Sequence, residues 1–281
     1  MTPTLRHGDR SDAVRDLQKR LNAQGAGLVV DALYDDATEA AVRDYQLRVG
    51  LVADGMAGPK TIASLNGADC SKLLRHADLH KASERLGISL ATVYAVNQIE
   101  SRGLGFLDNG KPVILFERHI MHRQLMVPRR QEDAPAALRE RANRFAASHP
   151  NLVNTKPGGY SGGTAEHPRL ARARQLHEMA ALESASWGSF QIMGFHWQRL
   201  GYASVHAFVD AMRTSESEQF AAFVSFIETA PVLHKALKAR KWPEFARGYN
   251  GPAYAKNLYD IKLKRAYERY RECACQTTAA S

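Results

Sequence analysis

A glutamate at the end of an apolar helix is the strongest candidate for chemistry in this sequence. The segment Ser89–Gly103 begins with a typical N-cap serine and ends with a typical post-helix glycine, which predicts a helix that ends just after Glu100. Val93, Val96 and Glu100 are spaced i, i+3 and i+7, so the carboxyl lies on the apolar face. Burial and the negative end of the helix dipole favour the protonated carboxyl, whereas Arg102 opposes them if it lies close. Glu100 is therefore either a general acid or an ordinary residue at a helix end.

Two later segments combine residues that suit sugar binding. Residues 187–193 read Trp-Gly-Ser-Phe-Gln-Ile-Met, and residues 248–251 read Gly-Tyr-Asn-Gly. Side-chain amides donate to and accept from N-acetyl groups, and a tyrosine offers a hydroxyl and an apolar ring face. We therefore expect Gln191, Tyr249 and Asn250 to contact a substrate.

The Glu-Ser-Arg-Gly sequence that starts at Glu100 and these two segments, in this order, resemble the lysozyme-like superfamily of goose-type lysozymes and soluble lytic transglycosylases. The resemblance implies a Glu-Ser pair at a helix end, a Gly-x-x-Gln-Ile turn that lines the sugar cleft, and a Tyr-Asn element opposite. Ser189 in that turn becomes a further candidate substrate contact. Trp187 either stacks on a sugar or belongs to the core, and Gly188 is expected to let the backbone approach the substrate.

Longer stretches are similar to a narrower family. They are Val113–His119, Lys156–Tyr160, Glu166–Leu170 and Ser184–Gly194. These stretches resemble the N-acetylmuramidase domain of phage endolysins, and the resemblance spans nearly all of residues 75–270. It implies that Glu100 protonates the glycosidic oxygen between N-acetylmuramic acid and N-acetylglucosamine.

The sequence leaves the second carboxylate of such a site open. Glu117, which stands after an apolar run and before an arginine and His119, either positions a water or forms a structural ion pair. Residues 148–166 are rich in Gly, Pro, Ser and Asn, and we interpret them as a substrate-facing or mobile loop. Tyr160 and Glu166 on this loop are candidate substrate contacts, and Glu166 is also another candidate for a direct catalytic role. Carboxyl groups about 5–5.5 Å apart imply retention of the anomeric configuration, and about 6.5–9.5 Å implies inversion.

The first 66 residues predict a compact module of three helices. Ser11 caps the first helix, an aspartate at 35–36 begins the second, and Gly58-Pro59 begins the third. An aspartate, an apolar residue, a threonine and an aliphatic residue recur at offsets 0, 2, 7 and 11, counted from Asp31 and again from Asp54. This internal repeat predicts two half-units that share one small core.

The same segment resembles the peptidoglycan-binding domain of cell-wall hydrolases. The matching residues are Leu5-x2-Gly8-x4-Ala13-Val14-x2-Leu17-Gln18, Thr38-x2-Ala41-Val42-x2-Tyr45-Gln46 and Gly50-Leu51-x2-Asp54-Gly55-x2-Gly58. Tyr34-Asp35 departs from the Phe-Gly that is usual in the family, which affects the local turn only. We predict a peptidoglycan-binding domain over residues 1–67, a linker over 68–74 and a catalytic domain over 75–281.

The charge distribution favours a polyanionic partner. The net charge is +9, and residues 1–70 carry 8 basic and 10 acidic side chains against 30 basic and 19 acidic in the remainder. No helix-turn-helix, ribonucleoprotein or zinc-finger pattern supports nucleic acid as that partner. The basic residues of the predicted helix 254–272 either form a solvated face or engage anionic outer-membrane lipid or lipopolysaccharide.

Several classes of site and location are not expected. His177-Glu178 lacks the second histidine of a zincin motif, so we expect neither a metal nor an organic cofactor. Cys70, Cys273 and Cys275 form no disulfide framework and are interpreted as spectator thiols. No apolar run reaches the ~20 residues of a membrane helix, and the N-terminus has no signal peptide. We expect the protein to stay in the host cytoplasm until lysis and then to act on the cell wall in the periplasm. As the resemblance implies, a phage holin would give it access to the wall.

The expected fold is mainly α: a small three-helix peptidoglycan-binding module and a larger lysozyme-like helical catalytic domain. Helices of the larger domain are predicted at 72–86, 89–102, 134–147, 168–184, 204–212, 215–228 and 254–272. The expected function is that of a monomeric endolysin that binds peptidoglycan and hydrolyses its β-1,4 glycosidic bond. Three alternatives remain: a lytic transglycosylase that forms 1,6-anhydro products, a non-catalytic wall-binding virion protein, and membrane disruption by the basic C-terminal helix.

Overall fold

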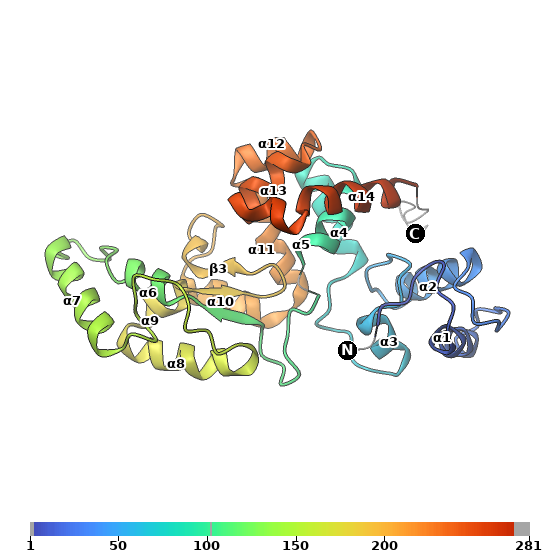
Figure 1. The fold of residues 1–281 in the computed structure, drawn as a ribbon, viewed down its shortest axis with the longest axis horizontal. Coiled ribbons are helices and arrows are strands. Elements are labelled where there is room, and N and C mark those ends of the chain that lie inside the picture. The colour runs from blue at the N-terminus through green and yellow to red at the C-terminus, as the bar shows by residue number, and fades with distance from the viewer. Residues whose placement is uncertain (1–2, 102, 273–281) are drawn as a thin grey trace. The chain divides into compact units, whose positions relative to one another are not determined.

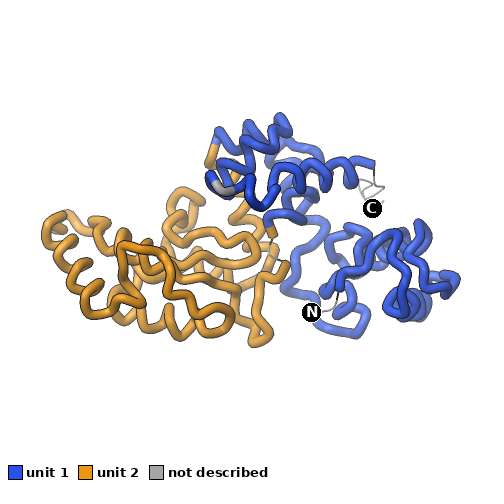
Figure 2. Tube along the Cα trace, in the orientation of Figure 1, with its two compact units in different colours: residues 1–100, 231–281 blue, residues 101–230 orange. Residues whose placement is uncertain are grey.

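The computed structural model describes residues 3–101 and 103–272 of the chain, and these residues are mainly helical with one small sheet (Figure 1). This confirms the predicted fold class. The chain divides into two compact units (Figure 2): unit 1 comprises Met1–Glu100 and Pro231–Ser281, and unit 2 comprises Ser101–Ala230.

The N-terminal part of unit 1 holds three helices, α1 (Asp12–Ala23), α2 (Asp36–Arg48) and α3 (Pro59–Leu65). The side chains of Ser11 and Asp35 cap α1 and α2, each by accepting a hydrogen bond from the backbone N–H three residues later. The third helix begins with its proline, where the missing N–H leaves no hydrogen bond unmade. All three predicted helix starts are confirmed.

The two half-units of the internal repeat contain the same buried hydrogen bonds, each made by one glutamine. The side-chain amide of Gln18 donates to Asp31, the Leu33 carbonyl and Thr38, at 2.9, 2.9 and 3.2 Å. The amide of Gln46 donates to Asp54, the Met56 carbonyl and Thr61, each at 3.0 Å. Each half-unit is therefore tied together by one buried glutamine, which satisfies its polar groups inside a small apolar core.

The rest of unit 1 is helical. It contains α4 (His76–Leu86), α5 (Leu90–Glu100), α12 (Pro231–Lys238), α13 (Trp242–Asn250), the short 3-10 segment η3 (Pro252–Asn257) and α14 (Tyr259–Glu272). α14 packs against α5, and its Leu263 and Tyr270 are buried while its lysines and arginines are exposed. The helix predicted over 254–272 is interrupted at Leu258, whose backbone is left-handed with φ 53°.

Unit 2 contains the sheet. The strands β1 (Ile114–Phe116), β2 (Ala185–Trp187) and β3 (Ile192–Met193) pair antiparallel in the order β1-β2-β3. Ile114 lies opposite Trp187, which in turn lies opposite Ile192. Trp187 is buried, and its indole N–H donates to the Leu182 carbonyl, so it belongs to the core as one of its two predicted alternatives.

The rest of the described regular structure of unit 2 is helical. Its elements are α6 (Arg118–Gln124), α7 (Pro135–Ser148), η1 (Gly163–Ala165), α8 (Glu166–Leu176), α9 (Glu178–Glu183), η2 (Gly194–His196), α10 (Val205–Thr214) and α11 (Glu216–Glu228). The single helix predicted over 168–184 is two helices, because His177 is extended. The His177 imidazole caps α9 by accepting from the Ala180 N–H at 3.2 Å. A capping residue inside a continuous apolar pattern thus ends one helix and starts the next.

The expectations stated for Arg102, Cys273 and Cys275 concern positions outside the described residues. Within the described ranges, no single helix is both long and apolar enough to cross a membrane. α11 and α12 reach the required length and composition only when taken together as a bent pair.

Candidate active site

Glu100 is the last residue of α5, and its side chain is 7% exposed. The helix begins as predicted, because the Ser89 hydroxyl accepts a hydrogen bond from the Thr92 N–H at 3.3 Å. Burial raises the pKa of the Glu100 carboxyl to about 7, and the hydrogen bonds from the Asn250 amide act in the opposite direction. This confirms the predicted direction, because the pKa of this carboxyl lies well above the usual value for a glutamate.

Asn250 ends α13 and lies against Glu100. Its side-chain nitrogen donates to both carboxylate oxygens of Glu100, each at 3.1 Å. The neighbouring Tyr249 is half-buried, and its ring stacks on Phe245 with centroids 5.9 Å apart and planes 3° apart. Two segments that are 150 residues apart in sequence are therefore joined at one carboxyl.

The β2–β3 turn is held by its own polar groups. The Gln191 amide donates to the Gly188 carbonyl at 2.8 Å and accepts from the Ser186 hydroxyl at 2.9 Å. Ser189 is buried, and its backbone N–H donates to Gln219 at 2.9 Å. Gln191 itself has a left-handed backbone with φ 51°, a strained conformation for a residue with a side chain. The turn is therefore rigid, with the Ser189 side chain turned away from solvent.

Gln219 on α11 is a site residue that the sequence analysis missed. Its side-chain nitrogen also donates to the carbonyls of Gly105 and Met212, at 3.2 and 2.9 Å. A Cβ on Gly188 would lie 2.5 Å from this side chain, so the glycine makes room for Gln219. The available signal was a pair of polar residues, Glu216 and Gln219, spaced i, i+3 on the buried face of an apolar helix.

Glu117 stands at the end of β1 and precedes α6. One of its carboxylate oxygens, Oε2, accepts from the Tyr160 hydroxyl at 2.7 Å and lies 3.2 Å from Nδ1 of His119. The side chain is 17% exposed, and the other oxygen, Oε1, has no hydrogen-bond partner within the described part of the chain. Glu117 thus has a histidine close to Oε2 and leaves Oε1 able to bind a water, so both alternatives predicted for it stay open.

Glu166 opens α8 and is 0% exposed. Its two oxygens accept hydrogen bonds from the backbone N–H groups of Phe116, Ser161 and Gly162 and from Arg169. Burial acts to raise the pKa of Glu166, but these hydrogen bonds and the charge of Arg169 outweigh it, so the pKa lies below its usual value. The structure thus places this predicted substrate contact in the interior, with its oxygens occupied.

Two arginines hold the glycine-rich loop. Arg169 donates to the carbonyls of Phe116, Asn151 and Gly158, and Arg118 donates to those of Pro150, Lys156 and Pro157. The loop therefore has a defined path over most of its length. Tyr160 of this loop is 47% exposed, and its hydroxyl donates a hydrogen bond to Glu117.

Comparisons with known proteins show which families this chain matches. Residues 89–271 match the N-acetylmuramidase family, and residues 10–65 match the family described as a putative peptidoglycan-binding domain. The chain is similar to the crystal structure of Burkholderia AP3 phage endolysin, with 52% identity, coverage of 96% of this chain and 100% of that chain, and a TM-score of 0.87.

A shorter similarity links the chain to a different kind of enzyme. A zinc D-Ala-D-Ala carboxypeptidase of Streptomyces albus G is 39% identical over an alignment of 87 positions, and the match covers 28% of this chain. The chain spans 34% of the length of that curated relative. The match to the muramidase family, in contrast, covers more than half of the chain. The chain therefore belongs to the N-acetylmuramidase family.

Proposed function

We propose that this chain is an endolysin that binds peptidoglycan and hydrolyses the β-1,4 bond between N-acetylmuramic acid and N-acetylglucosamine, with Glu100 as general acid. The observation that carries the proposal is a buried carboxyl with a pKa of about 7 in a chain of the muramidase family. Such a carboxyl gives its proton to the leaving glycosidic oxygen and is protonated again at neutral pH.

Asn250 supports both states of this acid. Its two hydrogen bonds fix the orientation of the carboxyl before proton transfer. After transfer Glu100 is an anion, and hydrogen bonds to an ionised acceptor are stronger than those to a neutral one. Asn250 therefore acts as a positioning residue that limits how far burial raises the pKa of Glu100.

For the second carboxylate we propose Glu117. Its Oε1 is open to a water or a sugar carbon, while the Tyr160 hydroxyl holds Oε2. NMR of the first-formed anomer distinguishes the two uses of this group, because a water activated by Glu117 inverts the configuration and a covalent intermediate retains it. Glu117→Gln is expected to slow hydrolysis in either case.

The remaining residues contribute in two ways. We propose Gln191 and Tyr249, both half-buried, as sugar contacts. Ser189 and Glu166 are buried, and their influence on a substrate passes through the turn and the loop that they hold.

We further infer that residues 1–67 hold the enzyme on the wall, with residues 68–74 as linker and 75–281 as catalytic domain. Linking a binding module to a catalytic one raises the effective substrate concentration without any new contact at the active site. The excess of basic residues after residue 70 adds attraction to an anionic polymer. Action in the periplasm then requires passage of the chain from the host cytoplasm, for which a holin is the expected route.

Mass spectrometry of digested peptidoglycan, before and after borohydride reduction, tests the proposal. Reducible muramic acid ends are expected from the wild type, with none from Glu100→Ala. Non-reducible anhydro ends would identify a lytic transglycosylase, and reducible glucosamine ends would move the cut to the other bond. Binding to peptidoglycan without cleavage would identify a non-catalytic wall-binding protein.

A further inference from the structure

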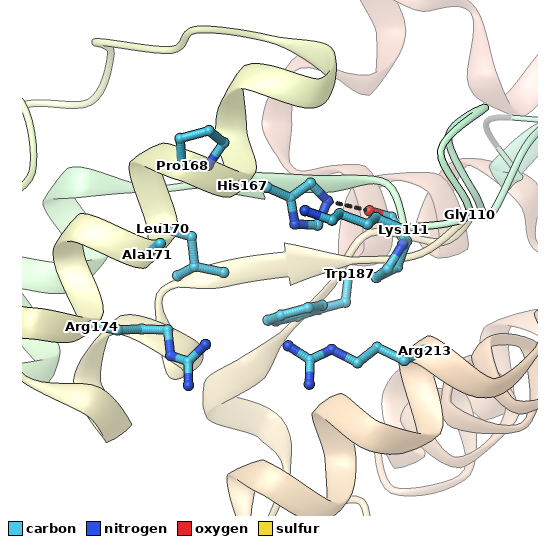
Figure 3. Close-up of a pocket in the computed structure, with 10 residues that line it drawn as sticks. Gly110, Lys111, His167, Pro168, Leu170, Ala171, Arg174, Trp187 and Arg213 are labelled. Carbon is cyan, nitrogen blue, oxygen red and sulfur yellow. Dashed lines mark hydrogen bonds between the residues drawn. The ribbon is translucent and has the colours of Figure 1, made fainter.

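Unit 2 contains a pocket of about 500 Å³ whose charged residues have no part in the proposed reaction (Figure 3). Its walls come from the loop before β1, from α8, from β2 and from α10. The residues that matter for its chemistry are Lys111, His167, Leu170, Arg174, Trp187 and Arg213. The volume suits one small group or a short segment of a larger ligand.

The charged lining of this pocket is entirely basic. Arg174 from α8 and Arg213 from α10 extend toward one another from opposite sides, and Lys111 crosses above them beside His167 (Figure 3). No acidic residue is among those that line it. Leu170 and Trp187 close the pocket with apolar surface.

The three cations are incompletely neutralised. Arg174 binds Glu178 through Nε and one terminal nitrogen, which leaves its second terminal nitrogen available. Arg213 has a single long contact, 3.5 Å to Asp210, and the Lys111 ammonium has no ion-pair partner among the described residues. Three positive charges face two carboxylates, so the site has room for one further negative charge.

The pKa of His167 responds to the positive charge of this pocket. Its Nε2 donates to the Pro112 carbonyl at 2.9 Å, because a carbonyl can only accept. Burial lowers the pKa of His167, and Lys111 and Arg213 lower it further, against the opposing effects of the Pro112 carbonyl and of Glu166. Glu166 is already engaged by Arg169, so its effect on the pocket is small beside that of the cations.

We propose that this pocket binds a carboxylate of an acidic peptide, and the proposal rests on the proposed function in that peptidoglycan strands carry such peptides. Guanidinium edges match the two oxygens of a carboxylate, and the apolar surface suits the aliphatic part of a peptide. Both arginines lie in the last turns of their helices, where the helix dipole does not attract a multiply charged phosphate. One carboxylate balances the site.

The test uses the full chain and a defined probe, the soluble peptide L-Ala-γ-D-Glu-meso-diaminopimelyl-D-Ala. NMR follows the His167 imidazole against pH with and without the peptide. Binding in the pocket is expected to raise the pKa of His167, because a bound anion offsets Lys111 and Arg213. A peptide that does not contact the pocket leaves the charges around His167 unchanged, so the readout is specific to the pocket.

Two double variants test whether the basic residues of the pocket determine its affinity for the peptide. The double substitution Lys111→Ala/Arg213→Ala is expected to raise the peptide concentration needed for half of the His167 change by about tenfold or more, since two charge-assisted contacts are lost. The matched control Arg123→Ala/Arg139→Ala removes two exposed basic residues from α6 and α7 and is expected to leave that concentration unchanged.

Three results would overturn the proposal: a peptide that leaves His167 unchanged, a fully amidated peptide that binds equally well, or inorganic phosphate that shifts His167 where the peptide does not. The last result would identify a phosphate site. If the wild type cleaves no glycan, the proposed function is wrong, but the peptide titration still tests the pocket. A pocket that binds no peptide in a chain that still cuts glycan would remove this inference alone.

Discussion

Glu100 in unit 1 and Glu166 in unit 2 are two buried glutamates at helix ends, with 7% and 0% of their surface exposed. Glu100 receives hydrogen bonds from one neutral amide, that of Asn250, whereas Glu166 receives three from backbone N–H groups and one from Arg169. Burial raises the pKa of the first to about 7, and the donors lower that of the second despite its deeper burial. The donors around a buried carboxyl, more than its depth, decide whether it holds a proton or a charge.

The two carboxyls also differ in how they couple stability to pH. The pKa of Glu100 is raised, so its contribution to the free energy of unfolding is fully present below its unfolded value of 4.5 and is lost as pH rises through about 7. The pKa of Glu166 is lowered, so its contribution is present above 4.5 and is lost as pH falls through the folded value. The first group opposes folding at alkaline pH, and the second supports it there.

The largest expected effect is that of Glu100→Gln on the rate of peptidoglycan hydrolysis. An amide has no proton to give, so hydrolysis of purified peptidoglycan is expected to fall by about 10²- to 10⁴-fold. The same substitution removes a buried ionisable group, and a thermal melt at pH 8 is expected to show a fold at least as stable as the wild type.

The exposed Glu244 on α13, which pairs with Lys241 just before that helix, offers a control. Glu244→Gln is expected to keep the wild-type rate and melting temperature, because exposed pairs contribute little. A Glu100→Gln protein that retains wild-type activity would show that the buried carboxyl is not the acid.

Glu166→Gln is expected to lower the free energy of unfolding by about 3–5 kcal/mol at pH 8, because Arg169 then stays buried without a counter-charge. The loss shrinks only as pH falls through the folded pKa of Glu166, which lies below 4.5, because the wild-type carboxyl is then itself protonated. Urea unfolding followed by tryptophan fluorescence at pH 8 and at a series of pH values below 4.5 measures the difference.

Glu140→Gln is the matched control, since Glu140 forms an exposed ion pair with Arg144 on α7. Its expected effect is about 0–1 kcal/mol. Equal unfolding midpoints for Glu166→Gln and the wild type would mean that the donors around Glu166 do not hold the loop.

The contrast between these glutamates also marks what the sequence can predict. The burial of Glu100 follows from local signals, namely a cap at Ser89 and apolar residues at helical spacing, and the structure confirms it. The helix starts and the repeat of the N-terminal module depend on similarly short distances, with Gln18 and Gln46 bonded within 20 residues along the chain.

Long-range partners could not be predicted in the same way. The Phe116 N–H that reaches Glu166 is 50 residues away, and Gln219 contacts Gly105 across 114 residues. The pairing of Asn250 with Glu100 spans 150 residues and was suggested only by the family resemblance. Helix breaks at His177 and Leu258 were missed because the apolar pattern continues through both.

Asn250→Ala sharpens the comparison by removing the donor of Glu100. The pKa of Glu100 is then expected to rise, so the alkaline limb of the pH–rate profile moves to higher pH, while the rate at pH 6 falls by less than about tenfold. Asn250→Asp places a like charge beside the carboxyl and is expected to move the limb further in the same direction. A limb that does not move, or moves down, would show that Glu100 does not set it.

Tyr160→Phe addresses Glu117, whose case lies between the two buried glutamates, with 17% exposure and one oxygen engaged. The substitution removes one hydrogen bond at a half-exposed ring, so the free energy of unfolding is expected to change by about 0.5–1 kcal/mol. If Glu117 positions the attacking group, the freed Oε2 also rotates more easily, and kcat falls several-fold with KM unchanged. A purely structural pair predicts the same small loss of stability with an unchanged kcat, because Oε1 never met the substrate. The ratio of the two effects therefore separates a carboxylate that is held in place for chemistry from one that is held only for the fold.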